Sequence, residues 1–231
     1  MGNVKVKNLG EIEAVGFDID GTIYAQWRIH LIALFHYLSH SMFFLHYGLV
    51  RHELHGSEQT PDFNRIQTEK MAQRLHCSYE EAAERLDKIV YKGLEKYFRK
   101  IPCYKDCLET IKKFKEAGLK IALLSDFPPE QKGDIWGIKP YCDVILGTEA
   151  LGALKPDPYS FKKMADLLGV APEKILFVGN SRKYDVTGSK AAGMKSAYLL
   201  AWRYRIFKFL KVKNADVTFS KYRQLQDFVL K

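Results

Sequence analysis

Two aspartates, Asp18 and Asp20, stand one residue apart, directly after a short apolar run and directly before Gly21 and Thr22. Carboxylates this close repel each other unless a cation lies between them, and Mg²⁺ prefers such hard oxygen ligands while keeping positions for water and phosphate. A carboxylate can also attack phosphorus, which gives an aspartyl-phosphate and divides the reaction into two easier steps. The pattern favours magnesium-assisted phosphoryl transfer, although the pentapeptide alone is also typical of a surface turn.

Short buried strands are the elements that would position these residues. An apolar run at 13–17 leads into Asp18, and a second at 120–124 leads into Ser125 and Asp126. Further strands are expected at 143–146, 175–178 and 196–200, with helical stretches near 106–117, 157–169 and 186–192. Strands that alternate with helices predict a three-layer α/β fold, and parallel sheets of this kind bind ligands beyond the carboxyl ends of their strands.

Residues 25–100 interrupt this alternation and carry helical patterns, as in 79–98. Within them, the 22 residues from Ile29 to Val50 contain no formal charge and are long enough to suggest a membrane span. A single crossing would place Asp18 and Ser125 on opposite sides of a bilayer, although their strands belong to one sheet. We therefore expect buried helices that pack inward, and no transmembrane segment.

Four segments, in order along the chain, resemble the four motifs of the haloacid dehalogenase superfamily phosphatases. They are Phe17-Asp-Ile-Asp-Gly-Thr-Ile23, Leu124-Ser-Asp126, Gly152-Ala-Leu-Lys-Pro-Asp-Pro158, and Phe177-Val-Gly-Asn-Ser-Arg-Lys-Tyr-Asp185 continuing to Ala192-Gly-Met194. Residues 215–230 resemble the closing strand and helix of that superfamily. The resemblance implies a Rossmann-like core formed by 1–24 and 101–231, with an inserted all-α cap at 25–100 as in the phosphoglycolate-phosphatase-like branch.

The resemblance also implies a role for each motif residue. Asp18 would be the nucleophile, and Asp20 the general acid and base, with a backbone carbonyl that binds the metal. Ser125 would donate a hydrogen bond to the phosphoryl oxygens, and Lys155 would neutralise their charge. Substrate contacts would include Ser125, Asp126, Lys155, Gly21 and Thr22, and the Mg²⁺ ligands would be Asp18, Asp20, Asn180 and Asp185. Asn180 departs from the family pattern, in which many relatives have an acid, and we expect weaker metal binding in consequence.

Three other functions are compatible with parts of the pattern. A phosphotransferase or phosphomutase would use the same residues. A metal-free 2-haloacid dehalogenase would use the same nucleophile, and Asn180 superficially favours it, but dehalogenases of this family lack the second acid that Asp20 supplies. A non-catalytic anion-binding protein could use the basic aromatic stretch 201–213. A phosphatase acting on a small phosphorylated metabolite fits the motifs best.

Composition sets the expected surroundings of the protein. The chain has 36 Lys and Arg against 27 Asp and Glu, a formal net charge of +9, which favours anionic partners in general. The stretch 201–213 supplies much of the excess and suggests weak contact with an anionic surface, while no specific nucleic acid is expected.

The four cysteines form no CxxC pair and no export signal opens the chain, so we expect reduced thiols and a cytoplasmic protein. All seven histidines lie between His30 and His76 without the spacing of a zinc site. The oligomeric state stays open.

Overall fold

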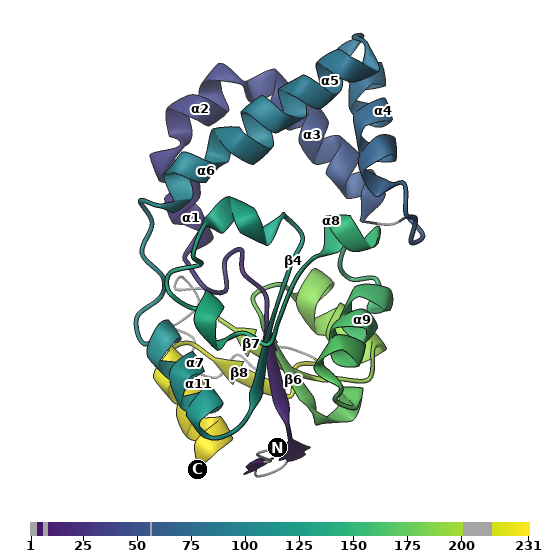
Figure 1. Cartoon of the computed structure of the whole chain (residues 1–231). Coiled ribbons are helices and arrows are strands. Elements are labelled where there is room, and N and C mark those ends of the chain that lie inside the picture. Colours follow the sequence, from purple (N-terminus) through teal and green to yellow (C-terminus); the bar gives the residue numbers. More distant parts are fainter. Residues whose placement is uncertain (1–3, 7–8, 56, 201–213) are drawn as a thin grey trace.

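A six-stranded parallel sheet forms the centre of the molecule (Figure 1). The computed structural model describes residues 4–6, 9–55, 57–200 and 214–231. The strand order is β5-β4-β3-β6-β7-β8, and every neighbouring pair is parallel. The strands are β3 (Ala14–Phe17), β4 (Lys120–Ser125), β5 (Val144–Gly147), β6 (Ile175–Gly179), β7 (Lys195–Leu199) and β8 (Val217–Phe219). The expected α/β fold with a parallel sheet and an inserted all-α cap is confirmed.

Strand β3 lies in the middle of the sheet, and its register aligns the motif residues. Phe17 pairs with Leu123 on one side and Val178 on the other. Asp18, Ser125 and Asn180 therefore follow three adjacent strands at one edge of the sheet. All four residues of β3 are buried, as expected for a central parallel strand that is covered on both faces.

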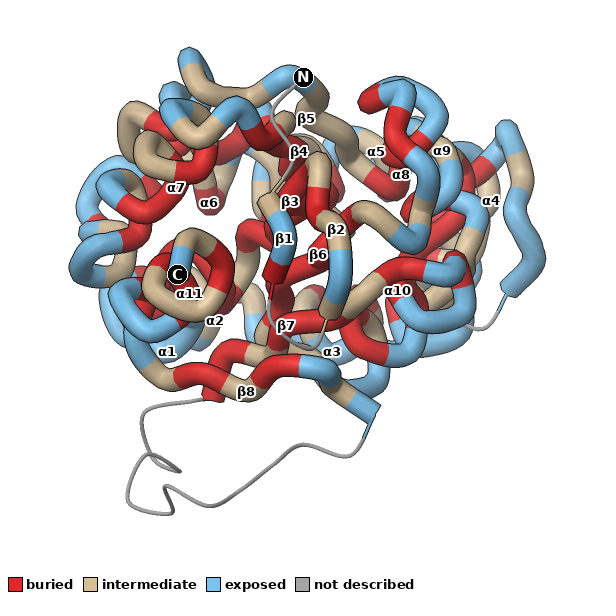
Figure 2. The backbone as a smooth tube through the Cα atoms, turned by 90° about the horizontal axis from the view of Figure 1, so that it is seen from below, coloured by how far each residue is buried: buried red, intermediate tan, exposed pale blue. Residues whose placement is uncertain are grey.

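Helices cover both faces of the sheet. Helices α7 (Cys107–Glu116) and α11 (Tyr222–Leu230) lie on one face, and α9 (Pro158–Leu168) and α10 (Thr187–Ala191) on the other (Figure 1). Figure 2 shows the buried strands between these two layers. A Cβ at position 16 would lie 2.9 Å from Met164 Cε on α9 and 2.9 Å from Phe177 Cδ2 on β6. Gly16 therefore leaves room for these two side chains beside β3.

Short elements complete the core. The strands β1 (Val4–Val6) and β2 (Gly10–Ile12) form an antiparallel pair beneath the sheet, which the sequence patterns did not predict. Single helical turns lie before or after several strands: η2 (Pro129–Lys132), η3 (Lys139–Tyr141), α8 (Thr148–Leu151), η4 (Pro172–Lys174) and the π-helical turn η5 (Arg182–Val186). The last of these begins the predicted helix at 186–192 four residues earlier than expected.

The helices between Gln26 and Phe98, called the cap below, lie over the carboxyl edge of the sheet (Figure 1). They are α1 (Gln26–Ile32), α2 (Leu34–Ser39), α3 (Ser41–Leu54), α4 (Phe63–Leu75), α5 (Tyr79–Arg85), the π-helical turn η1 (Leu86–Tyr91) and α6 (Lys92–Phe98). The two chain connections to the core run side by side, because Tyr24 and Cys103 form an antiparallel bridge and the Tyr104 N–H donates to the Ile23 carbonyl at 2.8 Å. The cap is thus attached through one paired hinge.

The expectation that the whole run from Ile29 to Val50 packs inward was wrong. The run is divided among three short helices, and its buried large residues are Ile29, Phe43, Tyr47 and Val50. Its exposed large apolar residues include Phe35, which is 84% exposed, and Met42, which is 62% exposed. The absence of charge does not distinguish an inward from an outward helix face, so the pattern could not show where each side chain would point. Among the described residues, no helix has the length and apolar character needed to cross a membrane.

Candidate active site

The predicted motif residues meet in one cavity between the carboxyl edge of the sheet and the cap. Its volume is about 840 Å³. Seven of the predicted site residues line it, namely Asp18, Asp20, Gly21, Asp126, Lys155, Asn180 and Asp185. The cap contributes Trp27, Tyr47, Arg51 and His55 to the opposite wall. A partly enclosed space with convergent carboxylates and ammonium groups is the kind of site in which charged groups react out of bulk water.

Lys155 joins two carboxylates at the floor of the cavity. Its Nζ donates to Asp18 Oδ1 at 2.5 Å and to Asp185 Oδ1 at 2.8 Å, and all three side chains are buried. Burial raises the pKa of Asp18 to about 7, since the lowering effect of Lys155 is opposed further by the charges of Asp185 and Asp20. Burial lowers the pKa of Lys155, but the surrounding carboxylates outweigh it and hold that pKa well above its usual range. Lys155 is therefore a fixed positive charge.

Asp20 is held by three side chains. Tyr24 donates to its Oδ1 at 2.6 Å, and Ser125 donates to its Oδ2 at 2.9 Å. The Lys132 ammonium lies 3.2 Å from the same Oδ2. Burial raises the pKa of Asp20, but Lys132 and the hydrogen bonds from Tyr24 and Ser125 lower it by more, so the net shift is downward. Asp20 is accordingly a carboxylate in this geometry, ready to accept a proton.

Asp185 and Asn180 form the wall that follows β6. The backbone N–H groups of Asn180 and Ser181 donate to Asp185 Oδ2 at 3.0 and 2.8 Å. A side chain at Gly179 could not fit, because its Cβ would lie 2.3 Å from Asp185 Cβ. Gly21 is needed in the same way: its φ is +92°, and a Cβ there would lie 2.2 Å from Asn180 Nδ2. The two glycines let Asp185 and Asn180 approach the turn that carries Asp18.

The remaining predicted residues support their neighbours. The Thr22 hydroxyl donates to Asp18 Oδ2 at 2.7 Å and is fully buried. Asp126 Oδ1 accepts from the Thr148 hydroxyl at 2.8 Å and from the Lys155 backbone N–H at 3.1 Å. Thus Asp126 fixes the loop that carries Lys155. In this geometry the Ser125 hydroxyl is bound to Asp20, so its expected contact with a phosphoryl oxygen stays a prediction.

The donor set fits a hard divalent cation. Three carboxylates, those of Asp18, Asp20 and Asp185, face two ammonium groups, those of Lys155 and Lys132. Burial is the main cause of the raised pKa of Asp18, and the charges of Asp185 and Asp20 add to it. The amide oxygen of Asn180 adds a neutral oxygen donor on the same wall. Within the described ranges, no group of three or more His, Cys, Asp or Glu side chains could hold a metal by itself. A cation here would therefore depend on few side chains, which is the usual situation for Mg²⁺.

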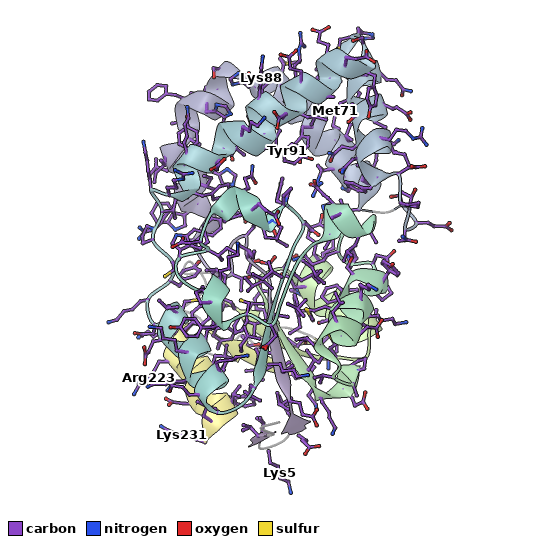
Figure 3. All side chains as sticks on the ribbon, viewed as in Figure 1. Lys5, Met71, Lys88, Tyr91, Arg223 and Lys231 are labelled. Carbon is purple, nitrogen blue, oxygen red and sulfur yellow. The ribbon has the colours of Figure 1, made fainter. Side chains whose placement is uncertain are left out.

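A buried polar network joins the cap to the core above the cavity. Arg51 on α3 forms an ion pair with Glu149 on α8, and it donates to the Asp126 carbonyl at 2.9 Å. The Tyr91 hydroxyl donates to the other Glu149 oxygen at 2.9 Å. Figure 3 shows Tyr91 on the side of the cap that faces the core, with Lys88 on the outer side. Burial raises the pKa of Glu149, although Arg51 and Tyr91 oppose this rise.

Two further contacts reach from core to cap. The side-chain N–H of Gln131 donates to the Val90 and Tyr91 carbonyls, each at 2.7 Å. These carbonyls belong to the π-helical turn η1, where the helical hydrogen-bond pattern changes. His55 Nδ1 lies 2.6 Å from the Lys155 carbonyl oxygen, and the His55 ring stacks on the Tyr184 ring. Together these contacts hold the cap closed over the cavity.

Sequence reasoning missed Lys132, Tyr24, Arg51 and Glu149. Lys132 lies in a short turn after two prolines, where no periodicity marks it as buried. Arg51 did carry a signal, because it is the first charge after the uncharged run 29–50. A lone charge at the end of an apolar helix indicates a buried partner, since burying an unpaired ion is costly.

A sequence model of the haloacid dehalogenase-like hydrolase family matches residues 12–193. This chain belongs to that family. As a haloacid dehalogenase-like hydrolase, it is an enzyme of the hydrolase class, and its family assignment agrees with the order of the four motifs along the sheet edge.

Relatives of this hydrolase are similar over nearly the whole chain. Pyrophosphatase PpaX of Halalkalibacterium halodurans is 26% identical, over 95% of this chain and 97% of that protein. Among solved structures, a HAD phosphatase from Thermococcus onnurineus has a TM-score of 0.62 at 23% identity, covering 94% of this chain and 97% of that one. A 2-haloacid dehalogenase from Pseudomonas syringae has a TM-score of 0.65 at 18% identity, covering 94% and 97%. At these identities the structures show a shared fold and do not choose between phosphatase and dehalogenase.

Proposed function

We propose that this protein is a Mg²⁺-dependent phosphatase that hydrolyses a small phosphate ester through an aspartyl-phosphate on Asp18. The observation that carries the proposal is the Asp20 carboxylate in the same cavity as Asp18. It accepts hydrogen bonds from the Tyr24 hydroxyl at 2.6 Å and from the Ser125 hydroxyl at 2.9 Å. A phosphate ester has an alkoxide leaving group that needs a proton, whereas halide leaves without one. The second acid therefore supports a phosphatase over a 2-haloacid dehalogenase.

In the first step, an Asp18 oxygen attacks phosphorus in line with the departing ester oxygen. Lys155, which lies 2.5 Å from Asp18 Oδ1, opposes the charge that builds up on the phosphoryl oxygens. Asp20 gives a proton to the leaving oxygen, so it must enter this step protonated. Asp20 is a carboxylate in the ligand-free geometry, so it must take up a proton when the substrate binds. The negative charge of the substrate favours this uptake, because a like charge nearby raises the pKa of a carboxyl.

In the second step, Asp20 takes a proton from water, and the resulting hydroxide attacks phosphorus to release phosphate and regenerate Asp18. The lowered pKa of Asp20 keeps its carboxyl ionised and therefore able to accept this proton. Magnesium, held by Asp18, Asp185, the Asn180 amide oxygen and the Asp20 backbone carbonyl, would supply positive charge to the phosphoryl group and orient it. Ser125, Gly21 and Thr22 would complete the contacts around the phosphoryl group.

The names of the relatives do not identify the leaving group of the substrate. One whole-length relative is called a pyrophosphatase, so inorganic pyrophosphate belongs in the substrate set beside small phosphate monoesters. A phosphotransferase or phosphomutase would pass the phosphoryl group from Asp18 to an alcohol in place of water. Since Asp20 would activate either acceptor, the acceptor itself has to be identified by measurement.

The test is a screen of phosphate monoesters and pyrophosphate with Mg²⁺, using Asp18→Asn and Asp20→Asn as matched variants. We expect Asp18→Asn to fold normally and to lose turnover, because an amide is a very poor nucleophile. Asp20→Asn should slow alkyl phosphates far more than activated aryl phosphates, which need less protonation of the leaving oxygen. Wild-type turnover by Asp18→Asn, or equal losses for both substrate types with Asp20→Asn, would contradict the mechanism.

A further inference from the structure

Exposed large apolar side chains are concentrated on the first three cap helices. Among the described residues, nine of the twelve exposed large hydrophobic residues lie between positions 27 and 49: Trp27, Leu31, Ile32, Leu34, Phe35, Leu38, Met42, Leu45 and Leu49. Isolated exposed apolar residues are ordinary on protein surfaces, but a concentration of this kind marks an interaction surface. We call these nine residues the cap apolar face.

Helical spacing places these residues on one side of each helix. Met42, Leu45 and Leu49 recur every three or four positions along α3, whereas the buried Phe43 and Tyr47 occupy its other side. The same spacing relates Trp27 to Leu31 on α1 and Leu34 to Leu38 on α2. Helices α1 and α3 therefore present exposed apolar residues in addition to the buried residues that pack in the cap, whereas α2 has exposed apolar residues and none that is buried.

The segment that carries this face contains no acidic residue. From Gly21 to His52 the sequence contains no Asp or Glu, while it contains Arg28, Arg51 and five histidines. Arg51 is buried in its ion pair with Glu149, but Arg28 lies beside the face, with its guanidinium 5.3 Å from the centre of the Trp27 ring. Arg28 borders the apolar and aromatic side chains of α1, and the sequence from position 21 to 52 supplies no acid, which complements an anionic lipid surface.

The end of β7 lines the active-site cavity together with one residue of this face. Helices α1 and α3 and strand β8 lie toward the same side of the molecule (Figure 2). Trp27 lines the active-site cavity together with Leu199 at the end of β7. The basic stretch 201–213, which lies outside the described residues, begins two positions after Leu199 in the sequence and carries five Lys or Arg without an acid. No helix that could span a membrane is found in the described part of the chain, so the contact would be peripheral.

We propose that the cap apolar face binds an anionic lipid surface, with the short helices α1, α2 and α3 lying in the interfacial region. This goes beyond the phosphatase function and does not depend on it. A second copy of this chain is the other occupant to consider. It is disfavoured because the segment between positions 21 and 52 has no acid that could pair with Arg28 of the other copy.

The test uses the full-length protein and sedimentation with lipid vesicles. Wild type is mixed with vesicles of phosphatidylcholine alone or of phosphatidylcholine with phosphatidylglycerol. We expect binding to the anionic vesicles that weakens as salt is added, since the charge contribution is screened. In a double variant, Phe35→Glu with Leu38→Glu, the partition coefficient should fall by about tenfold or more, because two apolar contacts are lost and two negative charges are added.

Matched controls separate this face from other sources of binding. Leu167→Glu changes another exposed leucine, on α9, and should bind like wild type. Neither Phe35 nor Leu38 lines the active-site cavity, so the double variant should keep its thermal stability and its hydrolysis of soluble substrates. Failure of wild type to sediment with anionic vesicles would overturn the proposal. So would unchanged binding of the double variant, with loss of binding only when the cations of 201–213 are neutralised.

The same proteins decide between a membrane and a second copy. Light scattering after size exclusion gives the mass of each in solution. A wild-type monomer that binds anionic vesicles supports the proposal. A wild-type dimer that becomes a monomer on Phe35→Glu with Leu38→Glu would assign the face to a second copy and would overturn it.

Discussion

The Lys132 ammonium lies 3.2 Å from Oδ2 of Asp20, and none of that lysine side chain is exposed. It also lies over the rings of Phe98 and Phe127, at 5.1 and 5.2 Å from their centres. A residue at the end of a short turn thus sets the charge environment of Asp20, the proposed general acid and base, in addition to the residues of the four motifs.

Replacing Lys132 with Met should raise the pKa of Asp20, because Lys132 is the main group that lowers it. The limb of the pH–rate profile that requires Asp20 as a base would then move to higher pH, and kcat would fall by about 10- to 100-fold. The measurement is kcat/KM against pH for Lys132→Met, with Lys162→Met as a control on the surface of α9. An unchanged pH profile would mean that Lys132 does not act on Asp20.

The Arg51–Glu149 ion pair predicts a strong coupling between cap and core. Removing Glu149 alone leaves a buried guanidinium without its carboxylate, and we expect Glu149→Gln to lower the free energy of unfolding by about 3 kcal/mol. Arg51→Met combined with Glu149→Gln should cost much less than the sum of the single changes. Urea unfolding of the four proteins gives the coupling energy. Additive losses would show that the two side chains do not stabilise each other.

Asn180 predicts a specific magnesium dependence. An aspartate at 180 would add negative charge beside Asp18 and Asp185, which attracts Mg²⁺ and repels a phosphate dianion. Asn180→Asp should therefore lower the Mg²⁺ concentration for half-maximal activity, and Asp185→Asn should raise it. Titrations of activity and of magnesium binding by calorimetry test both directions. Unchanged magnesium dependence in Asn180→Asp, or full wild-type activity in excess chelator, would remove position 180 from the metal site.

The raised pKa of Asp18 predicts a pH-dependent stability of the metal-free protein. Its pKa is about 7 in the folded protein, against 3.8 as the ordinary value. A raised carboxyl pKa stabilises the folded state most below the ordinary pKa, and this contribution is lost as pH rises through about 7, because the folded site must then hold the charge. In chelator, wild type should lose on the order of a few kcal/mol between pH 4 and 7 that Asp18→Asn does not lose.

Added Mg²⁺ should restore most of that loss above pH 7, because it binds the ionised carboxylates of the folded site. Urea unfolding at several pH values, with and without Mg²⁺, measures both effects. A wild-type stability that rises between pH 5 and 7 relative to Asp18→Asn would show that the sign of the Asp18 shift is wrong.

The sequence could predict the sheet and the motif residues because both follow from strand ends. Lys155 and Asp18 are 137 positions apart, yet Asp18 directly follows β3 and Lys155 lies in the motif after α8 at the same end of the sheet, so their contact is a consequence of topology. The position of Lys132 was not predictable in this way, because a lysine in an irregular turn has the same local pattern whether it points to solvent or into a site. The exposed apolar residues of α1 to α3 were not predictable for a related reason. The sequence shows which side chains are hydrophobic, but only the packed structure shows which of them are buried against other residues.

The paired hinge at Tyr24 and Cys103 has a consequence for how this chain could be divided. The backbone leaves the core at Tyr24 and returns directly beside it at Cys103. The two ends of the cap segment are therefore as close together as the two strand ends that a tight hairpin turn connects. A core in which a short turn replaces the cap should keep its strand order and its Asp18–Lys155–Asp185 cluster. In chain connectivity the fold is a modular assembly, and the contacts that still couple the cover to the chemistry are those of Arg51 with Glu149 and of Gln131 with the cap.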